Sequence, residues 1–234
     1  MLDCIYPLWA TRAEARDYNG FMSLELQQIR SYAEEGFLLF PEAVDKETVE
    51  RARQVLAQKV AGASENPYHT FVRDSAVSAC FNQKVCDAAA RLAGVGKKLA
   101  PPRTVYTVTV FPTAKPWELP APHIDHAGEE DRHRTFPPPF RVGCLIYLTD
   151  VQPHGGATIV WPGSHRRLEE LAKSNNERYA YLASVHRDIA TVDLGCPREI
   201  TARAGDVLFY QYLCAHSGSS NSGASPRFAL NHKW

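Results

Sequence analysis

The chain has 234 residues, of which 44% are hydrophobic and 22% are charged, and Lys plus Arg equals Asp plus Glu at 26 each. This length and balance suit one folded domain with a sizeable core and disfavour a disordered chain. A chain without net charge has no general attraction to phosphate backbones, so we expect no nucleic-acid partner.

Six cysteines occur without CxxC spacing: Cys4, Cys80, Cys86, Cys144, Cys196 and Cys214. In a chain of this length the pattern predicts reduced thiols rather than a disulfide framework or a zinc knuckle. The N-terminus lacks a basic segment followed by an apolar run, so no signal peptide is expected, and no stretch approaches the length of a membrane span. We expect a cytoplasmic protein without a membrane partner, and the sequence leaves its oligomeric state open.

The first part of the chain, residues 1–100, is expected to be mostly helical. Three helices are predicted, each with a capping residue or a glycine stop. They span residues 23–35, where Ser23 is the expected cap, 45–62, with Asp45 as cap, and 82–92. The apolar run Phe37–Phe40 predicts a short buried strand after the first helix.

Residues 101–234 change to short strand-like segments separated by Gly and Pro turns. β-Branched and aromatic residues alternate along residues 103–111. Further strand candidates are residues 142–148, 158–161, 199–201, 207–212 and 228–234. Many short strands with such turns predict a sandwich or barrel. We therefore expect a mainly β, jelly-roll core with N-terminal helices packed on it, within a single domain spanning residues 1–234.

Two long polar loops are expected, at residues 112–139 and 165–197. Long loops in compact domains often act as functional lids. A variable surface insertion is the alternative, and it is equally acceptable for the second loop.

A His-x-Asp motif lies in the first loop, at His123 and Asp125. On an extended strand these two side chains project from the same face. With one further His they form the 2-His-1-carboxylate facial triad of non-haem Fe(II) oxygenases. The motif recurs at His186 and Asp188, so its context must decide which copy binds metal.

The third ligand is expected to be a His on a later strand. His216 follows a tight turn and an apolar strand. Several strand candidates lie between Asp125 and His216, whereas residues 188–216 hold barely two. We therefore favour His123, Asp125 and His216 as the metal ligands, against the alternative that each His is an ordinary polar or surface residue.

Arg227 begins the last predicted strand, eleven residues after His216. A guanidinium binds a carboxylate through a two-pronged hydrogen bond that Lys cannot reproduce. A barrel with a facial triad and an inward Arg has the parts needed to bind a dicarboxylate keto acid. The alternative for Arg227 is a surface ion pair.

Several segments together carry a resemblance to a known family. They are His123-x-Asp125, residues 155–165 (GGATIVWPGSH), Ala204-Gly205-Asp206, His216 with Asn221, Arg227, and residues 32–41 (YAEEGFLLFP). In order and spacing they resemble the phytanoyl-CoA dioxygenase family of Fe(II)/2-oxoglutarate-dependent oxygenases, over residues 24–234. The resemblance implies a double-stranded β-helix, the cupin-like jelly roll, with iron on His123, Asp125 and His216.

The resemblance also implies the reaction and its co-substrates. Fe(II), 2-oxoglutarate and O2 would hydroxylate an unactivated C–H bond of a small-molecule substrate and release succinate and CO2. Arg227 would bind the distal carboxylate of 2-oxoglutarate. Where the family often has a Ser two residues after the distal His, this chain has Gly218, so Ser217, Thr158 and Tyr106 are the candidates to assist Arg227.

Four residues are candidates for contact with the substrate: Trp117, His126, Arg141 and Tyr147. The first two lie in the first loop, and the others lie on or beside an early barrel strand. The same site could instead perform desaturation, epoxidation or cyclisation. A catalytically silent binding jelly roll is a further alternative, and the intact triad with Arg227 counts against it. A cupin-like enzyme that uses another metal without a keto acid is the last alternative, and Arg227 with the family order of the motifs counts against that one.

Overall fold

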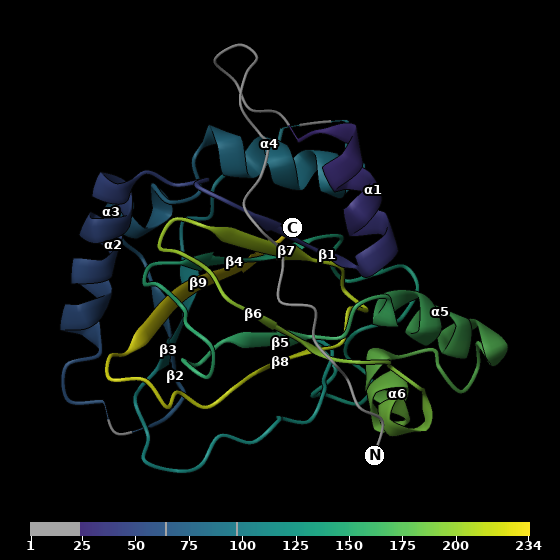
Figure 1. Cartoon of the computed structure of the whole chain (residues 1–234). Helices are drawn as coiled ribbons and strands as arrows, with labels where there is room; N and C mark the ends of the chain where they lie inside the picture. The colour runs from purple at the N-terminus through teal and green to yellow at the C-terminus, as the bar shows by residue number, and fades with distance from the viewer. Residues whose placement is uncertain (1–23, 64, 97) are drawn as a thin grey trace.

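The computed structural model describes residues 24–63, 65–96 and 98–234. Two antiparallel sheets form its centre (Figure 1). The larger has the strand order β1-β7-β4-β9-β3-β2 and the smaller the order β6-β5-β8. The strands are β1 (Phe37–Phe40), β2 (Tyr68–Val72), β3 (Val105–Val110), β4 (Gly143–Tyr147), β5 (Thr158–Val160), β6 (Arg198–Ile200), β7 (Val207–Tyr210), β8 (His216–Gly218) and β9 (Arg227–Lys233).

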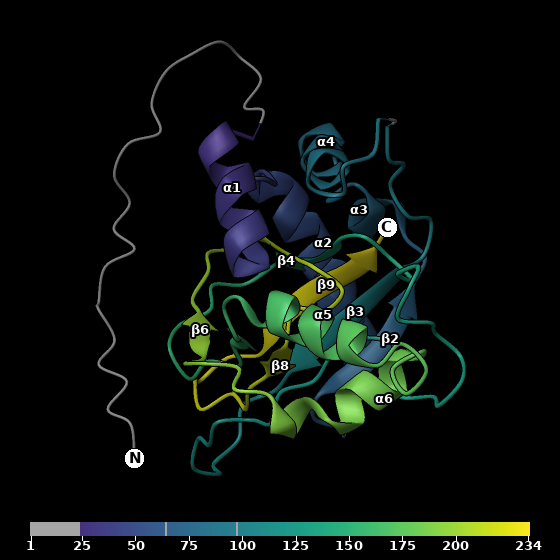
Figure 2. The same cartoon turned by 90° about the vertical axis from the view of Figure 1, so that its right-hand side faces the viewer.

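Helices cover the outer face of the larger sheet and one end of the smaller sheet (Figures 1 and 2). They are α1 (Leu26–Glu35), α2 (Lys46–Lys59), α3 (Ser75–Ser78), α4 (Gln83–Leu92), α5 (Ser164–Ser174), α6 (Leu182–Arg187) and the 3-10 helix η1 (Ile189–Thr191). The predicted jelly-roll core with N-terminal helices is therefore confirmed.

Strand alternation sorts the larger sheet into two apolar faces. Phe40, Ile146 and Leu230 point outward and pack in one cluster with residues of α1, α2 and α4. Tyr147 and Ala229 point inward and share a second cluster with Val160 and Ile200 of the smaller sheet. The space between the two sheets is the interior in which the predicted site must lie.

Local sequence signals explain most of the helix ends. The backbone N–H of Gly36, at φ 82°, donates to the Tyr32 carbonyl and ends α1. Asp45 and Asn82 accept hydrogen bonds from the first turns of α2 and α4, as N-cap residues do. The expected cap Ser23 lies outside the described residues, and α1 begins at Leu26 after Glu25.

Residues 165–197 were predicted to form a second loop, and this prediction is wrong. The segment holds α5, α6 and η1, which follow directly on β5. Its apolar residues Leu168, Leu182 and Val185 are fully buried and pack with Ile159 of the smaller sheet. Burial of this apolar face stabilises short helices that their polar composition does not suggest. The sequence analysis also missed β2, α3 and β8.

Residues 112–139, the first predicted loop, are all described and contain no helix or strand. Isolated β-bridges attach this loop to other parts of the chain. They pair Pro112 with Asn221, His123 with His216, and Arg134 with Tyr181. Its middle, which carries the His-x-Asp motif, is thereby fixed against β8.

Four cysteines are free and buried, as expected: Cys80, Cys86, Cys144 and Cys214. Cys196 is disulfide-bonded, so the expectation of a reduced thiol is wrong there, because spacing along the chain does not show which thiols meet in space. Cys4 lies outside the described residues. Among the helices described, none has the length and apolarity to cross a bilayer.

Candidate active site

The three predicted metal ligands come together between the two sheets. One ligand atom from each of His123, Asp125 and His216 lies within 4.8 Å of the others. Reciprocal backbone hydrogen bonds of 2.9 and 3.0 Å join His123 and His216, which brings the first loop beside β8. Two imidazoles and one carboxylate that occupy one face of a metal position are the donor set of a non-haem Fe(II) site.

The surroundings of the two imidazoles favour metal binding. His216 Nδ1 lies 2.8 Å from the Cys214 carbonyl, which can only accept a hydrogen bond, so this nitrogen carries the proton. His216 Nε2 is then free, 3.6 Å from Asp125 Oδ2. Burial, and then the neighbouring His216, lower the pKa of His123 to about 4. Metal binding therefore does not need to displace a proton from His123 at neutral pH.

The Asp125 carboxylate is held from two sides. The Tyr210 hydroxyl donates to Oδ2 at 2.8 Å, and Lys233 Nζ lies 3.1 Å from Oδ1. Burial alone would raise the pKa of Asp125, but His216, Lys233 and the Tyr210 hydrogen bond outweigh it and bring that pKa to about 2. Asn231 Nδ2 donates to the Tyr210 oxygen at 3.0 Å and so orients the hydroxyl toward Asp125.

A glycine makes room for this arrangement. Gly143 of β4 pairs with Tyr210 of β7, and a Cβ atom at Gly143 would lie 2.5 Å from the tyrosine ring. The ring therefore lies across the glycine, a close approach that side chains would prevent.

Sequence reasoning missed Tyr210, Asn231 and Lys233. A signal for the last two was present, because alternation along the final strand places residues 227, 229, 231 and 233 on one face. Tyr210 carried no comparable signal, since its role depends on the pairing of β7 with β4.

Arg227 forms a second centre in the interior. Its side chain is buried, with 3% of the residue exposed, and its Nε donates to the Gly156 carbonyl at 2.8 Å. Nη1 is also buried and has no hydrogen-bond partner in the described structure. Burial lowers the pKa of Arg227, which reflects the cost of enclosing its charge. An anionic group would supply the missing partner, so this site fits the distal carboxylate of 2-oxoglutarate.

Two hydroxyl side chains accompany Arg227. Tyr147 OH donates to Thr158 Oγ1 at 3.0 Å, and both residues are buried. Tyr147 pairs with Ala229, two residues from Arg227 on the same face of β9, and the Arg227 charge lowers the pKa of Tyr147 while burial, the larger cause, raises it. Thr158 thus lies where it was predicted, whereas Tyr147, predicted to contact the substrate, belongs to the Arg227 centre.

Strand register sets the separation between the two centres. Val160 pairs with His216, and Thr158 pairs with Gly218. The metal ligand and the hydroxyl pair therefore lie on the same face, two residues apart, or about 7 Å along the strands. A five-carbon dicarboxylate spans that distance.

The other two candidates to assist Arg227 lie in different places. Tyr106 faces the interior opposite Asn231, and its ring stacks on His69 with centroids 5.4 Å apart. Ser217 pairs with Ile159, so alternation turns it to the face of β8 opposite that of His216 and Gly218. The structure does not bring Ser217 to the Arg227 centre, because Ser217 is one residue away from His216 on β8 and therefore points to the other face of the strand.

The remaining substrate candidates are spread around the site. The Trp117 ring stacks on His154 at 4.3 Å, and its indole nitrogen is buried without a partner in the described structure. His126 lies 3.2 Å from His133 through ring nitrogens and packs on Phe140. Arg141 is exposed, so the structure does not place it in the interior.

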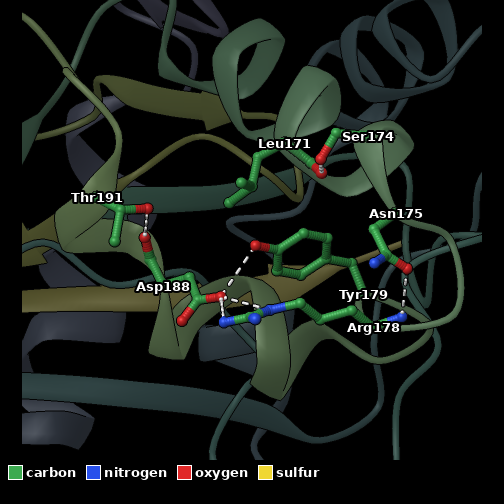
Figure 3. Close-up of polar contacts among 7 residues, drawn as sticks. All are labelled: Leu171, Ser174, Asn175, Arg178, Tyr179, Asp188 and Thr191. Carbon is green, nitrogen blue, oxygen red and sulfur yellow. Dashed lines mark hydrogen bonds and ion pairs between the residues drawn. The ribbon is translucent and has the colours of Figure 1, made fainter.

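The second His-x-Asp motif has a structural role, as Figure 3 shows. Asp188 Oδ2 accepts hydrogen bonds from Arg178 and from the Tyr179 hydroxyl, at 2.6 and 2.9 Å for the shortest contact with each. These contacts join the end of α6 to the turn after α5. His186 is partly buried, and its Nδ1 is enclosed without a hydrogen-bond partner in the described structure, so the interpretation of this motif as a surface piece is wrong for His186.

Comparisons with known proteins agree with this geometry. The model of the family described as phytanoyl-CoA dioxygenase (PhyH) matches residues 32–229. Over 104 residues the chain is 26% identical to the ectoine dioxygenase of Stutzerimonas stutzeri (strain A1501). That alignment covers 39% of this chain and about a third of the relative, at 34%.

Solved structures share the fold at low sequence identity. The carbocyclase SnoK of nogalamycin biosynthesis, described as non-heme and alpha-ketoglutarate-dependent, is 20% identical, with a TM-score of 0.65 over 91% of this chain and 85% of SnoK. EvdO2 from Micromonospora carbonacea var. aurantiaca is 13% identical, with a TM-score of 0.62 over 92% of this chain and 91% of its own. The epimerase SnoN, solved with Fe3+, alpha-ketoglutarate and nogalamycin RO, is 16% identical, with a TM-score of 0.60 over 88% of this chain and 80% of SnoN.

Proposed function

The chain belongs to the phytanoyl-CoA dioxygenase family of Fe(II)- and 2-oxoglutarate-dependent oxygenases, and we propose that it hydroxylates an unactivated C–H bond of a small molecule. The observation that carries the proposal is the pairing of a complete facial triad with a buried, partly unpaired Arg227 in one interior. Neither centre alone distinguishes this reaction from simple metal binding or from a structural ion pair.

His123, Asp125 and His216 would hold the iron and leave its remaining positions open. When bound with 2-oxoglutarate, iron supplies O2 activation coupled to the release of succinate and CO2. The Cys214 carbonyl keeps the Nε2 lone pair of His216 directed at the metal position. Tyr210 holds Asp125 on Oδ2, which limits rotation of the carboxylate.

Arg227 would bind the distal carboxylate of 2-oxoglutarate. Its Nε is already committed to the Gly156 carbonyl, which fixes the plane of the guanidinium and leaves Nη1 for the ligand. The Tyr147–Thr158 hydroxyl pair adds donors beside it. Arg227, Tyr147 and Thr158 are all buried, so a charged hydrogen bond between them and a ligand is stronger than one at the surface.

A second outcome on the same site is also proposed: cyclisation, epimerisation, desaturation or epoxidation after the same C–H attack. Similar structures include those of a carbocyclase and an epimerase, and this supports the second outcome. Product analysis separates the possibilities, since hydroxylation adds one oxygen atom and the other reactions leave ring closure, inversion, a double bond or an epoxide. Ectoine is one small molecule to test first, because a segment of the chain resembles an ectoine dioxygenase.

The experiment begins without the substrate. The protein is mixed with Fe(II) and 2-oxoglutarate under anaerobic conditions, and the visible metal-to-ligand charge-transfer band is recorded. We expect the band in the wild type and its loss in His216→Ala. Absence of the band in a folded, iron-loaded wild type would refute the assignment.

The duplicated motif supplies a matched control. Asp125→Asn and Asp188→Asn make the same chemical change in two His-x-Asp sequences. We expect only Asp125→Asn to abolish the band and the 2-oxoglutarate-dependent release of succinate. Equal loss in both variants would point to general destabilisation instead of metal ligation.

A further inference from the structure

Lys233 is a second interior cation, at the end of β9 away from Arg227. It pairs with Gly143 across to β4 and has 21% of its side chain exposed. It lies six positions after Arg227 on the same strand face, which separates the two Cα atoms by about 20 Å. The two cations therefore lie near different ends of the interior, and Lys233 cannot share the carboxylate that Arg227 binds.

When the metal and 2-oxoglutarate are bound, no negative charge of Asp125 or 2-oxoglutarate remains to balance the charge of Lys233. Its ion pair among the described residues is with Asp125, at 3.1 Å. A divalent metal and Arg227 together balance Asp125 and the two carboxylates of 2-oxoglutarate. The positive charge of Lys233 then remains uncompensated, and such a charge beside a metal is unfavourable unless an anion joins it.

The neighbours of Lys233 do not supply that anion. Its ammonium lies 5.7 Å from the centre of the Phe140 ring, an attractive contact that carries no negative charge. The partners of His126 on the same side are the His133 ring, at 3.2 Å, and the Phe140 ring, and neither carries a negative charge. Since an ammonium has three donors, Lys233 can retain Asp125 Oδ1 and still bind a further acceptor.

Two aromatic residues lie on the same sheet face as Lys233, on the neighbouring strands β3 and β2. Tyr106 lies opposite Asn231, and Phe71 lies opposite Tyr106, in the register of these strands. The two rings are 5.1 Å apart, and Phe71 is 72% exposed. An exposed aromatic surface beside a positively charged group fits a molecule that has an acidic end and an apolar body.

We propose that Lys233 binds a carboxylate of the primary substrate, so that the enzyme acts on anionic small molecules. The inference rests on the proposed oxygenase function. It identifies Lys233 as a specificity-determining residue, with Phe71 and Tyr106 as the surface that contacts the carbon skeleton.

The test uses the full chain loaded with Fe(II) and 2-oxoglutarate without oxygen. Phenylacetate, octanoate and ectoine are each titrated beside the corresponding primary amide, and the shift of the charge-transfer band reports binding near the metal. The proteins are wild type, Lys233→Met, Lys233→Arg and the surface control Lys173→Met, whose lysine pairs with Glu169 on α5. Succinate release in air is measured with the same compounds.

We expect at least one acid to bind the wild type about 10- to 100-fold more tightly than its amide, the range that one charged hydrogen bond provides. Lys233→Met should remove this preference and raise KM for the acid by a similar factor. Lys233→Arg should keep most of the preference, and Lys173→Met all of it. The affinity of Lys173→Met for 2-oxoglutarate should equal that of the wild type.

Other outcomes overturn the inference, and they can be told apart. If the wild type gives no charge-transfer band, the oxygenase proposal fails and this inference fails with it. If the band forms but no acid is preferred, or the preference survives in Lys233→Met, only the role of Lys233 is refuted. If Lys233→Met weakens iron or 2-oxoglutarate binding instead, Lys233 positions Asp125 and does not recognise substrate.

Discussion

Replacement of Arg227 by Lys tests how the co-substrate is bound. The variant retains a positive charge but loses the planar fork. In the structure, Nε is occupied by the Gly156 carbonyl and Nη1 is buried without a partner. A single ammonium on a shorter stem cannot satisfy both the carbonyl and a carboxylate in the same geometry.

The expected magnitude follows from the number of bonds lost. One charge-assisted hydrogen bond contributes about 1.5–3 kcal/mol, so the Kd for 2-oxoglutarate should rise about 10- to 150-fold. Anaerobic titration of the Fe(II)-loaded protein with 2-oxoglutarate measures this through the charge-transfer band. Iron binding alone should be unchanged, because Arg227 makes no contact with the three metal ligands.

Arg198→Lys is the matched control, because Arg198 is half-exposed and pairs with Glu35 at the surface. We expect its affinity for 2-oxoglutarate to equal that of the wild type. An Arg227→Lys protein that is folded and binds 2-oxoglutarate as tightly as the control would refute the role assigned to Arg227.

Three further variants test other parts of the structure. Gly143→Ala should displace the Tyr210 ring, since a Cβ atom would lie 2.5 Å from it. Asp125 would then lose the Tyr210 hydrogen bond, and the affinity for Fe(II) should fall about tenfold. An unchanged affinity would contradict the role of Tyr210 in holding Asp125. Burial, and then Lys233, lower the pKa of His232 to about 4. Between pH 6.5 and 4 the unfolded chain therefore binds a proton at His232 that the folded protein does not bind. The free energy of unfolding falls as the pH falls through that range. His232→Gln should therefore remove about 2–3 kcal/mol of the decrease in unfolding free energy between pH 7 and 4.5, measured by urea denaturation, and identical pH dependence would exclude this origin. Asp188→Asn should lower the midpoint of thermal unfolding, because Arg178 loses its partner, while the affinity for 2-oxoglutarate stays constant.

Local patterns in the sequence were sufficient for much of the fold. The caps at Asp45 and Asn82 and the stop at Gly36 act within one helical turn, so the residues themselves report them. Alternation of apolar residues identified β3, and short strand-like runs between turn residues identified β4, β7 and β9, for the same reason. The cytoplasmic location and the boundaries of the single domain stay predictions. The oligomeric state stays open.

The segment at residues 165–197 shows where local patterns fail. Its polar residues outnumber its buried ones, and its helices form because Leu168 and Leu182 pack against the smaller sheet. That packing energy is tertiary, and it is absent from any window of the sequence. The disulfide at Cys196 is a second case, because thiol pairing depends on proximity in space.

The sequence by itself determined the chemistry of the metal: two histidines, one carboxylate and an arginine of the kind that binds keto acids. Tertiary structure decided which His-x-Asp motif meets His216, and it brought Tyr210 to Asp125 across 85 positions of the chain. It also turned Ser217 away from the co-substrate centre and placed Lys233 beside Asp125. The physical reason is strand register: residue types fix what a side chain can bind, but pairing between distant strands decides which side chains share a face.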